Sequence, residues 1–258
     1  MNVMKTTNVT LALVTGGSRG LGKNMALHLA DHGVDTVITY RTNAEEARAV
    51  VQEIEKKGRK AVALPLDAGD ARSFGAFAET LTASMTRTWK RDRIDALVNN
   101  AGIGIHASFA ETTEEQFDEL MRIHLKGTFF LTQKLLPLIS DGGRILNVST
   151  GLARFTFPGF AAYAAMKGGI EVLTRYMAKE LGARGISVNT LAPGAIETDF
   201  GGGVVRDNEA MNKGIAAQTA LGRVGLPDDI GAAVAMLLSP ESKWINGQRI
   251  EVSGGMVL

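Results

Sequence analysis

Short apolar runs alternate with longer amphipathic segments along most of the chain. The apolar runs span residues 11–16, 35–40, 60–66, 94–100, 143–150, 185–194 and 248–255. Each is brief, which is typical of strands buried in a sheet. Between them, apolar residues recur at helical spacing, most clearly over 21–33, 43–58, 113–139 and 227–240. Because strands alternate with helices, the pattern predicts an α/β fold whose parallel sheet is covered on both faces.

Two segments refine this picture. Thr112 and Glu115 have the spacing of a capping box, which predicts where the long helix over 113–139 begins. Residues 201–225 are rich in glycine and only weakly periodic, so we expect a mobile segment there. No linker or low-complexity stretch divides the chain, and we therefore predict a single domain over residues 1–258.

Composition and charge exclude several classes of function. The 258 residues include 45% hydrophobic and 21% charged positions, with a formal net charge of +1. That charge provides no strong field to recruit nucleic acid or acidic lipid. No cysteine is present, which excludes disulfides, thiolate metal sites and a cysteine nucleophile. The four histidines, His28, His32, His106 and His124, follow no metal-ligand spacing.

Targeting signals are also missing from the sequence pattern. Residues 1–10 have no apolar signal-peptide core. No apolar run reaches the roughly 20 residues that a membrane helix needs. We therefore expect a cytoplasmic protein with a small-molecule substrate and without a nucleic-acid, membrane or metal partner.

A glycine-rich turn follows the first predicted strand. In "TGGSRGLG" (15–22), Gly16, Gly20 and Gly22 lead into the first predicted helix. A helix N-terminus offers free N–H groups and partial positive charge to a phosphate, and ligands bind beyond the carboxyl ends of parallel strands. The spacing differs from the common G-x-G-x-x-G fingerprint, but its place predicts a dinucleotide site. The alternative is a glycine turn required only by the geometry of the connection.

The end of the second predicted strand favours NADP(H) over NAD(H). An acidic side chain at this place accepts a hydrogen bond from the ribose 2′-hydroxyl of NAD. The sequence instead reads "TYRTN" over 39–43, with Arg41 and no carboxylate. Arg41 can pair with a 2′-phosphate, assisted by Arg19 of the glycine turn. The alternative is that both arginines are only solvated.

A tyrosine and a lysine stand four residues apart in "AAYAAMKGG" (161–169). Residues at i and i+4 lie on one face of a helix, and a nearby ammonium lowers the pKa of a phenol. The spacing of Tyr163 and Lys167 therefore predicts that the Tyr163 phenol is suited to proton transfer near neutral pH. The alternative is that they are ordinary neighbours on a helix surface.

Several motifs in this order resemble one family. They are "TGGSRGLG" (15–22), "LD" (66–67), "NNAG" (99–102), "NVST" (147–150), "YAAMK" (163–167), "PG" (193–194) and "VSGG" (252–255). Together they resemble the short-chain dehydrogenase/reductase family over nearly the whole chain, and the opening is similar to the 3-oxoacyl-carrier-protein reductase branch. The resemblance implies a Rossmann-like, doubly wound parallel sheet of about seven strands. It also implies a cofactor half at about 1–150, a catalytic and substrate half at about 151–258, and a homotetramer built on the long fourth and fifth helices.

The resemblance further implies roles for individual residues. Tyr163 is expected to act as general acid during ketone reduction, or as base during alcohol oxidation. Lys167 is expected to lower the pKa of Tyr163 and to bind the nicotinamide ribose. The residues expected at the cofactor are Gly16, Ser18, Arg19, Gly20, Leu21, Gly22, Arg41, Thr42, Asp67, Ala68, Asn99, Ala101, Gly102, Tyr163, Lys167, Pro193, Gly194, Ile196 and Thr198.

Two positions depart from the family pattern. The family's serine, thirteen residues before the tyrosine, is Thr150 here. A threonine hydroxyl makes the same hydrogen bond, although its methyl group crowds the site and stiffens χ1. Ser149 is a less favoured stand-in, because successive strand residues point to opposite faces. His124 replaces the family's asparagine in the long helix; it either relays protons, since histidine titrates near neutrality, or only packs between helix and sheet.

The substrate can be predicted only as a class. The apolar residues expected at the pocket are Ile103, Leu152, Phe155, Phe157 and Phe160, together with the segment 199–218. For each phenylalanine, core packing or a subunit interface is the alternative. The glycines at 201–203 suit a lid hinge or a disordered loop. We expect a ketone or secondary alcohol with an apolar body.

These features predict an NADP(H)-dependent oxidoreductase that transfers a hydride between nicotinamide and a ketone or secondary alcohol. Thr150, Tyr163 and Lys167 are its expected reacting centre. Two alternatives remain. One is a catalytically idle dinucleotide-binding redox sensor, for which the changes at 124 and 150 leave room. The other is an isomerase or dehydratase of the same fold.

Overall fold

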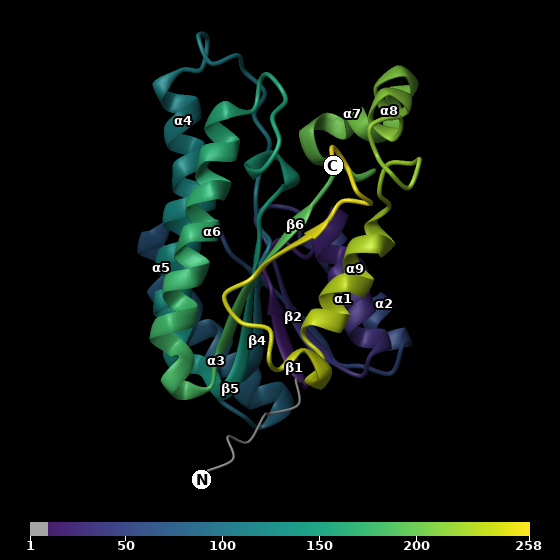
Figure 1. Cartoon of the computed structure of the whole chain (residues 1–258). Coiled ribbons are helices and arrows are strands. Elements are labelled where there is room, and N and C mark those ends of the chain that lie inside the picture. The colour runs from purple at the N-terminus through teal and green to yellow at the C-terminus, as the bar shows by residue number, and fades with distance from the viewer. Residues whose placement is uncertain (1–9) are drawn as a thin grey trace.

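The computed structural model describes residues 10–258, which form a layered α/β structure (Figure 1). The strands are β1 (Leu11–Val14), β2 (Asp35–Tyr40), β3 (Ala61–Pro65), β4 (Ile94–Asn99), β5 (Ile139–Val148), β6 (Ser187–Pro193) and β7 (Arg249–Val252). Within this part of the chain they form one parallel sheet in the order β3-β2-β1-β4-β5-β6-β7. The predicted fold class is confirmed.

Helices cover both faces of this sheet (Figure 1). One face carries α1 (Gly20–Asp31), α2 (Ala44–Lys56) and α9 (Pro227–Leu237), and the other carries α3 (Phe74–Trp89), α4 (Glu114–Leu120), α5 (Thr128–Leu135) and α6 (Ala161–Leu181). Side chains alternate along a strand. In β1, Ala12 and Val14 therefore join the core that includes α1, α2 and α9, whereas Leu11 and Leu13 join the core that includes α3, α5 and α6.

The long helix predicted over 113–139 is interrupted. Between α4 and α5 lies η2 (Met121–Gly127), a π-helical segment, followed by η3 (Leu136–Leu138). The capping box lies one residue later than predicted, on Thr113 and Gln116. A π-turn adds a residue to the helical turn and often occurs at functional sites. Here it buries His124 between the helix and the sheet.

Strand ends also differ slightly from the sequence pattern. β5 begins at Ile139 rather than 143, and its pairing with β4 shifts register between Ile94 and Ala96. It ends at Val148, so Ser149 and Thr150 follow the strand directly. The catalytic candidates at 149–150 therefore lie at the carboxyl edge of the sheet, where parallel sheets bind ligands.

The glycine-rich segment 201–225 contains more helix than its weak periodicity predicts. After η6 (Phe200–Gly203) come α7 (Val204–Asp207) and α8 (Glu209–Ala216), above the carboxyl edge of the sheet (Figure 1). Short helices of this kind give little periodic signal, because they present few turns to a core. The smaller elements η1 (Ala71–Ser73), η4 (Gly151–Ala153), η5 (Gly182–Arg184) and η7 (Pro240–Ser242) complete the description.

Membrane insertion finds no support in the helices. Among residues 10–258, no helix is both long enough and apolar enough to cross a bilayer. The first nine residues, on which part of the argument against a signal peptide rests, lie outside the described residues.

Candidate active site

The glycine turn lies where the sheet changes winding direction. β1 is flanked by β2 on one side and β4 on the other, which is the topological switch point of a doubly wound sheet. Thr15 fixes the two loops there, since its Oγ1 accepts hydrogen bonds from the backbone N–H groups of Asn100 and Ala101 at 2.9 and 3.0 Å. The Asn100 amide in turn donates to the Thr15 carbonyl at 2.9 Å. These hydrogen bonds therefore join the loop after β1 to the loop after β4.

Backbone conformation and close contacts explain the glycines of this turn. Gly16 and Gly20 have positive φ values of 67° and 53°, which favour glycine. A Cβ on Gly16 would lie 3.0 Å from Cα of Ala101, and one on Gly22 would overlap the carbonyl of Gly16. Above Gly20, by contrast, the nearest atom to such a Cβ is on Thr198 at 4.0 Å. The turn is therefore closely packed at Gly16 and Gly22, and it leaves space at Gly20, on the side that faces Thr198.

The electrostatics of the turn suit an anionic ligand. α1 starts at Gly20 with no side-chain cap on its N-terminal N–H groups and no acidic residue in its first turn. Arg19 and Arg41 are exposed nearby, and within residues 10–258 neither side chain makes a hydrogen bond or ion pair. Ser18 and Leu21 belong to the same turn, and Thr42 follows Arg41 after β2. These residues fit a dinucleotide that carries several phosphates.

Other predicted cofactor residues lie at the ends of the neighbouring strands. Asp67 follows β3, and its carboxylate accepts the Gly69 N–H at 2.8 Å beside Ala68. β6 ends at Pro193 and Gly194 follows it, and Ile196, two residues further on, forms a bridge with Gly225. Thr198 lies opposite Gly20, and its hydroxyl accepts the Phe200 N–H at 3.2 Å. The loops after β1 and β6 therefore face one another.

The Asn99 side chain is buried at the end of β4, and its expected place beside the cofactor stays a prediction. Its amide donates to Thr132 Oγ1 at 2.9 Å and to Asn147 Oδ1 at 2.8 Å, so the side chain is engaged with α5 and β5. The neighbouring Asn100, which sequence reasoning missed as a site residue, holds the glycine turn instead. Sequence alone does not say which of two adjacent asparagines faces the turn.

Tyr163 and Lys167 lie close together and are buried on α6. Their side chains pack at the end of β5, where the Lys167 ammonium donates to the Val148 carbonyl at 2.6 Å. The ammonium nitrogen lies 5.7 Å from the centre of the Tyr163 ring. The Thr150 side chain lies close enough to the Tyr163 phenol to lower its pKa in part. The structure thus brings the three predicted catalytic groups together.

Burial changes the expected acidity of both groups. Desolvation raises the pKa of Tyr163 above its ordinary value, and the hydrogen bond with Thr150 offsets this only in part. Burial therefore outweighs any lowering of this pKa by Lys167, and the expected effect of Lys167 on the phenol stays a prediction. The same burial lowers the pKa of Lys167 to about 8. Tyr163 consequently holds its proton at neutral pH, as a proton donor requires.

His124 does not titrate near neutrality, contrary to one expectation. Burial, together with the nearby Lys167 charge, lowers its pKa to about 3. Nε2 lies 2.8 Å from the Ile103 carbonyl, while Nδ1 is buried without a hydrogen-bond partner among the described residues. The ring meets the Tyr163 ring edge to face at 5.2 Å, and a Cβ on Gly102 would lie 2.5 Å from it. A neutral imidazole thus packs behind the tyrosine, and a proton-relay role stays a prediction.

The hydroxyls of Ser149 and Thr150 point to different partners. Ser149 Oγ is buried and donates to Glu171 Oε1 at 2.7 Å, eight residues along α6 from Tyr163. The Thr150 side chain lies near the Tyr163 phenol, and its hydroxyl oxygen accepts the Leu152 N–H at 3.3 Å. The geometry favours Thr150 as the group that meets a substrate oxygen.

We expect Thr150→Ala to lower kcat for ketone reduction by roughly 10- to 100-fold, because one hydrogen bond to the developing alkoxide is lost. Ser149→Ala should change kcat by less than about threefold, since its hydroxyl serves Glu171. Steady-state kinetics of the two variants, with cofactor saturating, checks this. A larger loss in Ser149→Ala than in Thr150→Ala would contradict the assignment.

The apolar wall beside Tyr163 is smaller than the sequence predicts. Ile103, Leu152 and Phe160 pack in the same cluster as Tyr163. Phe155 is buried against Gly151 instead, with Phe157 beside it at 5.8 Å. Neither of these two belongs to the Tyr163 cluster; Phe155 is buried and Phe157 is half-buried.

Phe200 is a neighbour of Tyr163 that sequence reasoning did not single out. Its ring lies 5.6 Å from that of Tyr163, remains 43% exposed, and packs on Gly104. The segment 199–218, which was expected to wall the pocket, supplies this ring. The three glycines that follow it all have positive φ. The position of Phe200 directly before these three glycines was the feature of the sequence that could have indicated its place at the site.

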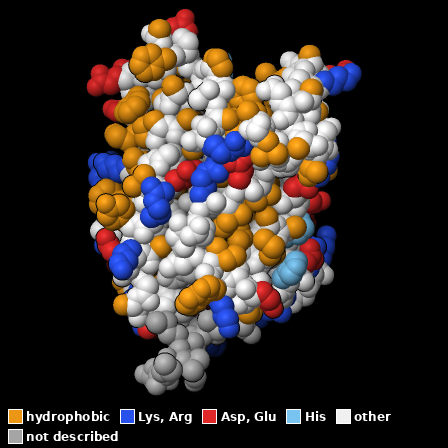
Figure 2. Space-filling view, viewed as in Figure 1, with side chains coloured by type: hydrophobic (Ala, Val, Ile, Leu, Met, Phe, Trp, Pro, Cys, Tyr) orange, Lys and Arg blue, Asp and Glu red, His pale blue; other side chains and the backbone are white. Residues whose placement is uncertain are grey.

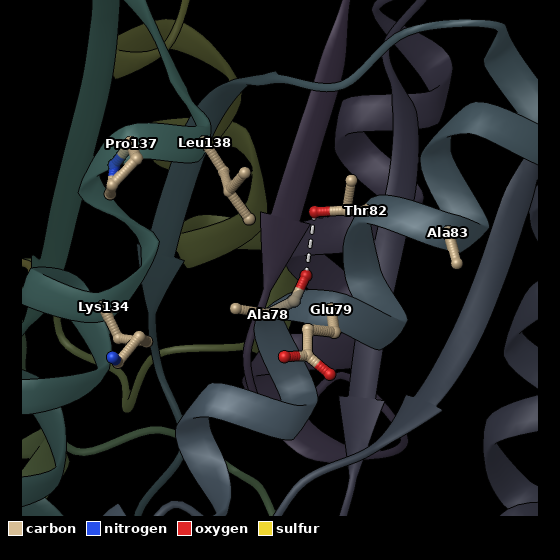
Figure 3. A pocket seen from close by; sticks show the side chains of 7 residues that line it. All are labelled: Ala78, Glu79, Thr82, Ala83, Lys134, Pro137 and Leu138. Atoms are coloured by element: carbon tan, nitrogen blue, oxygen red, sulfur yellow. Dashed lines mark hydrogen bonds between the residues drawn. The ribbon is translucent and has the colours of Figure 1, made fainter.

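A separate surface hollow of about 450 Å³ opens between α3 and the end of α5 (Figure 3). Its lining residues are Ala78, Glu79, Thr82, Ala83, Lys134, Pro137 and Leu138. None of them is a predicted site residue. This hollow plays no part in the site at the carboxyl edge of the sheet.

Comparisons with known proteins agree with this geometry. The family model described as enoyl-(acyl carrier protein) reductase matches residues 16–257. The hydroxynaphthalene reductase-like protein Arp2 of Metarhizium brunneum is 37% identical over 263 residues, covering 96% of this chain and 94% of the relative. The 3-oxoacyl-[acyl-carrier-protein] reductase FabG of Staphylococcus aureus is 36% identical over 249 residues, covering 96% and 98%. The solved structure of landomycin C-6 ketoreductase LanV with bound NADP and rabelomycin has a TM-score of 0.87 and 34% identity, covering 96% of each chain.

Proposed function

The chain belongs to the short-chain dehydrogenase/reductase family, and we propose that it is an NADP(H)-dependent ketoreductase with Tyr163 as its general acid. The observation that carries the proposal is the buried Tyr163 phenol, which has the Thr150 side chain and the Lys167 ammonium beside it. This group lies at the carboxyl edge of the sheet, as the glycine turn does. An idle binding protein has no use for a buried ammonium and phenol, which cost stability.

The chain's own residues supply a proton and orientation. NADPH, when bound, supplies the hydride that reduces the carbonyl carbon. Thr150 donates a hydrogen bond to the carbonyl oxygen and orients it toward Tyr163. Tyr163, still protonated because burial raises its pKa, gives its proton to that oxygen as negative charge develops. The Lys167 ammonium then stabilises the resulting phenolate. One hydride and one proton together convert the ketone to a secondary alcohol.

The cofactor proposed is NADP(H). The guanidinium groups of Arg19 and Arg41 support it, because they have no partner within residues 10–258 and a 2′-phosphate offers them a bidentate acceptor. LanV, similar over nearly its full length, is described with bound NADP. Tyr163, Lys167 and the loop from Pro193 to Thr198 are proposed to hold the nicotinamide end.

We expect Arg41→Glu to reverse cofactor preference. The new carboxylate repels a 2′-phosphate and accepts a hydrogen bond from a ribose 2′-hydroxyl, which should raise KM for NADPH by roughly 10- to 100-fold. KM for NADH should fall or stay constant. Arg48→Glu on α2, another exposed arginine, serves as the matched control and should leave both values unchanged. Equal KM values for NADPH in Arg41→Glu and wild type would contradict the proposed phosphate contact.

The proposed substrate is a ketone on an apolar, ring-shaped body. Ile103, Leu152, Phe160 and the half-exposed Phe200 ring beside Tyr163 support this, since flat apolar molecules pack well on aromatic faces. Two similar proteins also have polycyclic compounds in their names, a hydroxynaphthalene in one and rabelomycin in the other.

A panel of aliphatic, monocyclic and polycyclic ketones, followed by NADPH absorbance, tests the function. We expect turnover, fastest with polycyclic ketones. NADPH binding without turnover of any ketone or alcohol would favour the redox-sensor alternative. Conversion of a substrate without change in NADPH would favour the isomerase or dehydratase alternative.

A homotetramer is part of the proposal. On the helices that cover the α4–α6 face, several apolar side chains remain exposed, namely Phe117, Phe129, Phe130, Val172 and Tyr176. Exposed apolar residues gathered on one side of a protein are typical of an interface. Light scattering coupled to size-exclusion chromatography measures the oligomeric state.

A further inference from the structure

Four charged side chains form a connected network between α6 and the sheet edge at β7. The Arg154 guanidinium donates to both carboxylate oxygens of Glu251, each at 2.7 Å. Arg249 donates to Glu251 at 2.7 Å and to Glu171 of α6 at 2.8 Å. Figure 2 shows basic and acidic side chains gathered in the middle of this face, in the region of β6 in Figure 1.

The inner part of this network is shielded from water. The side chains of Glu171, Glu251 and Arg249 are 14%, 18% and 22% exposed. The bidentate hydrogen bonds from Arg154 are the main cause that lowers the pKa of Glu251 to about 2. The Glu251 carboxylate is therefore charged at neutral pH. A half-buried network with bidentate geometry is more rigid than a solvated surface pair.

One end of the network holds the strand end that carries Thr150. Arg249 Nη2 donates to the backbone carbonyl of Thr150 at 3.2 Å. Glu171, held by Arg249, accepts the hydroxyl of Ser149 at 2.7 Å. Both residues just beyond β5 are therefore fixed by a single guanidinium and its partner. Thr150 is held by its backbone on one side and meets Tyr163 with its hydroxyl on the other.

The other end of the network holds the last residues of the chain. Arg154 donates to the carbonyls of Met256 and Val257 at 2.8 and 2.9 Å. Val257 has a φ of 51°, an unfavourable conformation for a β-branched residue that such contacts help to maintain. This tail pairs with the segment after α8 through the bridge between Thr219 and Met256. The network thus links the catalytic strand end with the base of the α7–α8 segment.

We propose that Arg249 is a positioning residue, which fixes the backbone of Thr150 so that its hydroxyl meets both the Tyr163 phenol and the substrate oxygen. This inference rests on the proposed function, since it concerns how Thr150 is aligned for ketone reduction. A guanidinium is required because it serves Glu171, Glu251 and the Thr150 carbonyl at once, and a lysine ammonium cannot reach the three in this fork geometry. Glu251 supports Arg249 by accepting a hydrogen bond from its guanidinium, which fixes the orientation of that group.

The rival explanation is purely structural, namely that the network only fastens β7 to α6. The two differ in whether the effect of Arg249 passes through Thr150. A double-mutant cycle measures this directly, because residues that act as a unit are strongly non-additive. The variants are Arg249→Lys, Thr150→Ala and the double variant, compared in kcat and KM with a ketone that the wild type reduces.

We expect Arg249→Lys to lower kcat by roughly 10-fold with KM for NADPH unchanged, since small misplacements of a positioning group are costly. In the Thr150→Ala background the same change should cost less than about twofold. Arg184→Lys is the matched control, because Arg184 also joins a carboxylate, Asp141, to backbone carbonyls, those of Leu136 and Ile139. These partners lie at or just before the start of β5, at the opposite end of that strand from Thr150, so kcat should stay constant.

An equal loss in both backgrounds, or an unchanged kcat in Arg249→Lys, would overturn the proposal. If Arg249→Lys does not fold, Glu251→Gln takes its place in the same cycle with the same expected outcomes. Absence of ketone reduction by the wild-type protein is a separate result, and it would overturn the proposed function itself.

Discussion

Replacing Tyr163 by phenylalanine is expected to lower kcat for ketone reduction by ~10²–10⁴-fold, the usual contribution of a general acid. Phenylalanine keeps the ring that packs against His124 and Phe200 but has no proton to donate. The fold and the cofactor groove should therefore persist. Steady-state kinetics with saturating NADPH measures the loss, and quenching of protein fluorescence on NADPH addition measures retained cofactor binding.

The matched control is Tyr176→Phe. Tyr176 lies on the same helix, α6, but is 65% exposed. Phenylalanine keeps the apolar ring that the proposed subunit interface uses, so loss of the Tyr176 hydroxyl should leave kcat within about twofold of wild type. A Tyr163→Phe variant with near-normal kcat would show that another group supplies the proton.

Replacing Lys167 by methionine is expected to abolish most activity and at the same time to stabilise the fold. The ammonium is lost from the side of the phenol, so kcat should fall by ~10²-fold or more. The lowered pKa of Lys167, from 10.5 to about 8, means that burial of its charge opposes folding. A shift of this size corresponds to roughly 3 kcal/mol, reduced by about 1 kcal/mol because the hydrogen bond to Val148 is lost as well. Methionine should therefore raise the free energy of unfolding by about 2 kcal/mol.

The gain in stability should depend on pH with a definite sign. Between about pH 8 and pH 10.5, the unfolded chain keeps the Lys167 proton while the folded chain has released it. Wild-type stability therefore rises with pH across this window relative to the methionine variant. Urea unfolding at pH 7 and pH 10 should show the difference between the two proteins narrowing as pH increases. Lys179→Met, at an exposed position near the end of α6, should show neither effect. A Lys167→Met variant less stable than wild type at pH 7 would contradict the burial argument.

The fold can be predicted well from the sequence, because strands, turns and helix faces depend on the residues of short continuous segments. β2 spans the predicted residues 35–40 without change, since an apolar run bounded by polar residues fixes both ends. The glycine turn is also predictable, because the positive φ of Gly16 and Gly20 favours a residue without a side chain. Tyr163 and Lys167 share one helix face through spacing alone.

What sequence reasoning misses depends on tertiary packing. The raised pKa of Tyr163 and the lowered pKa of His124 follow from burial, which no pattern along the chain measures. The choice between Asn99 and Asn100 depends on which amide reaches Thr15. The pair Arg249 and Glu171 joins residues 78 positions apart, and nothing in either local sequence indicates the other.

Transfer of a deuterium label from NADPH to product tests the central claim most directly. NADPH with deuterium at both C4 positions of the dihydronicotinamide ring is incubated with the protein and a polycyclic ketone, and the alcohol is examined by mass spectrometry and NMR. We expect one deuterium on the carbinol carbon for each NADPH consumed, with the hydroxyl proton derived from solvent through Tyr163. An alcohol without deuterium at that carbon, or consumption of NADPH without formation of an alcohol, would contradict the account.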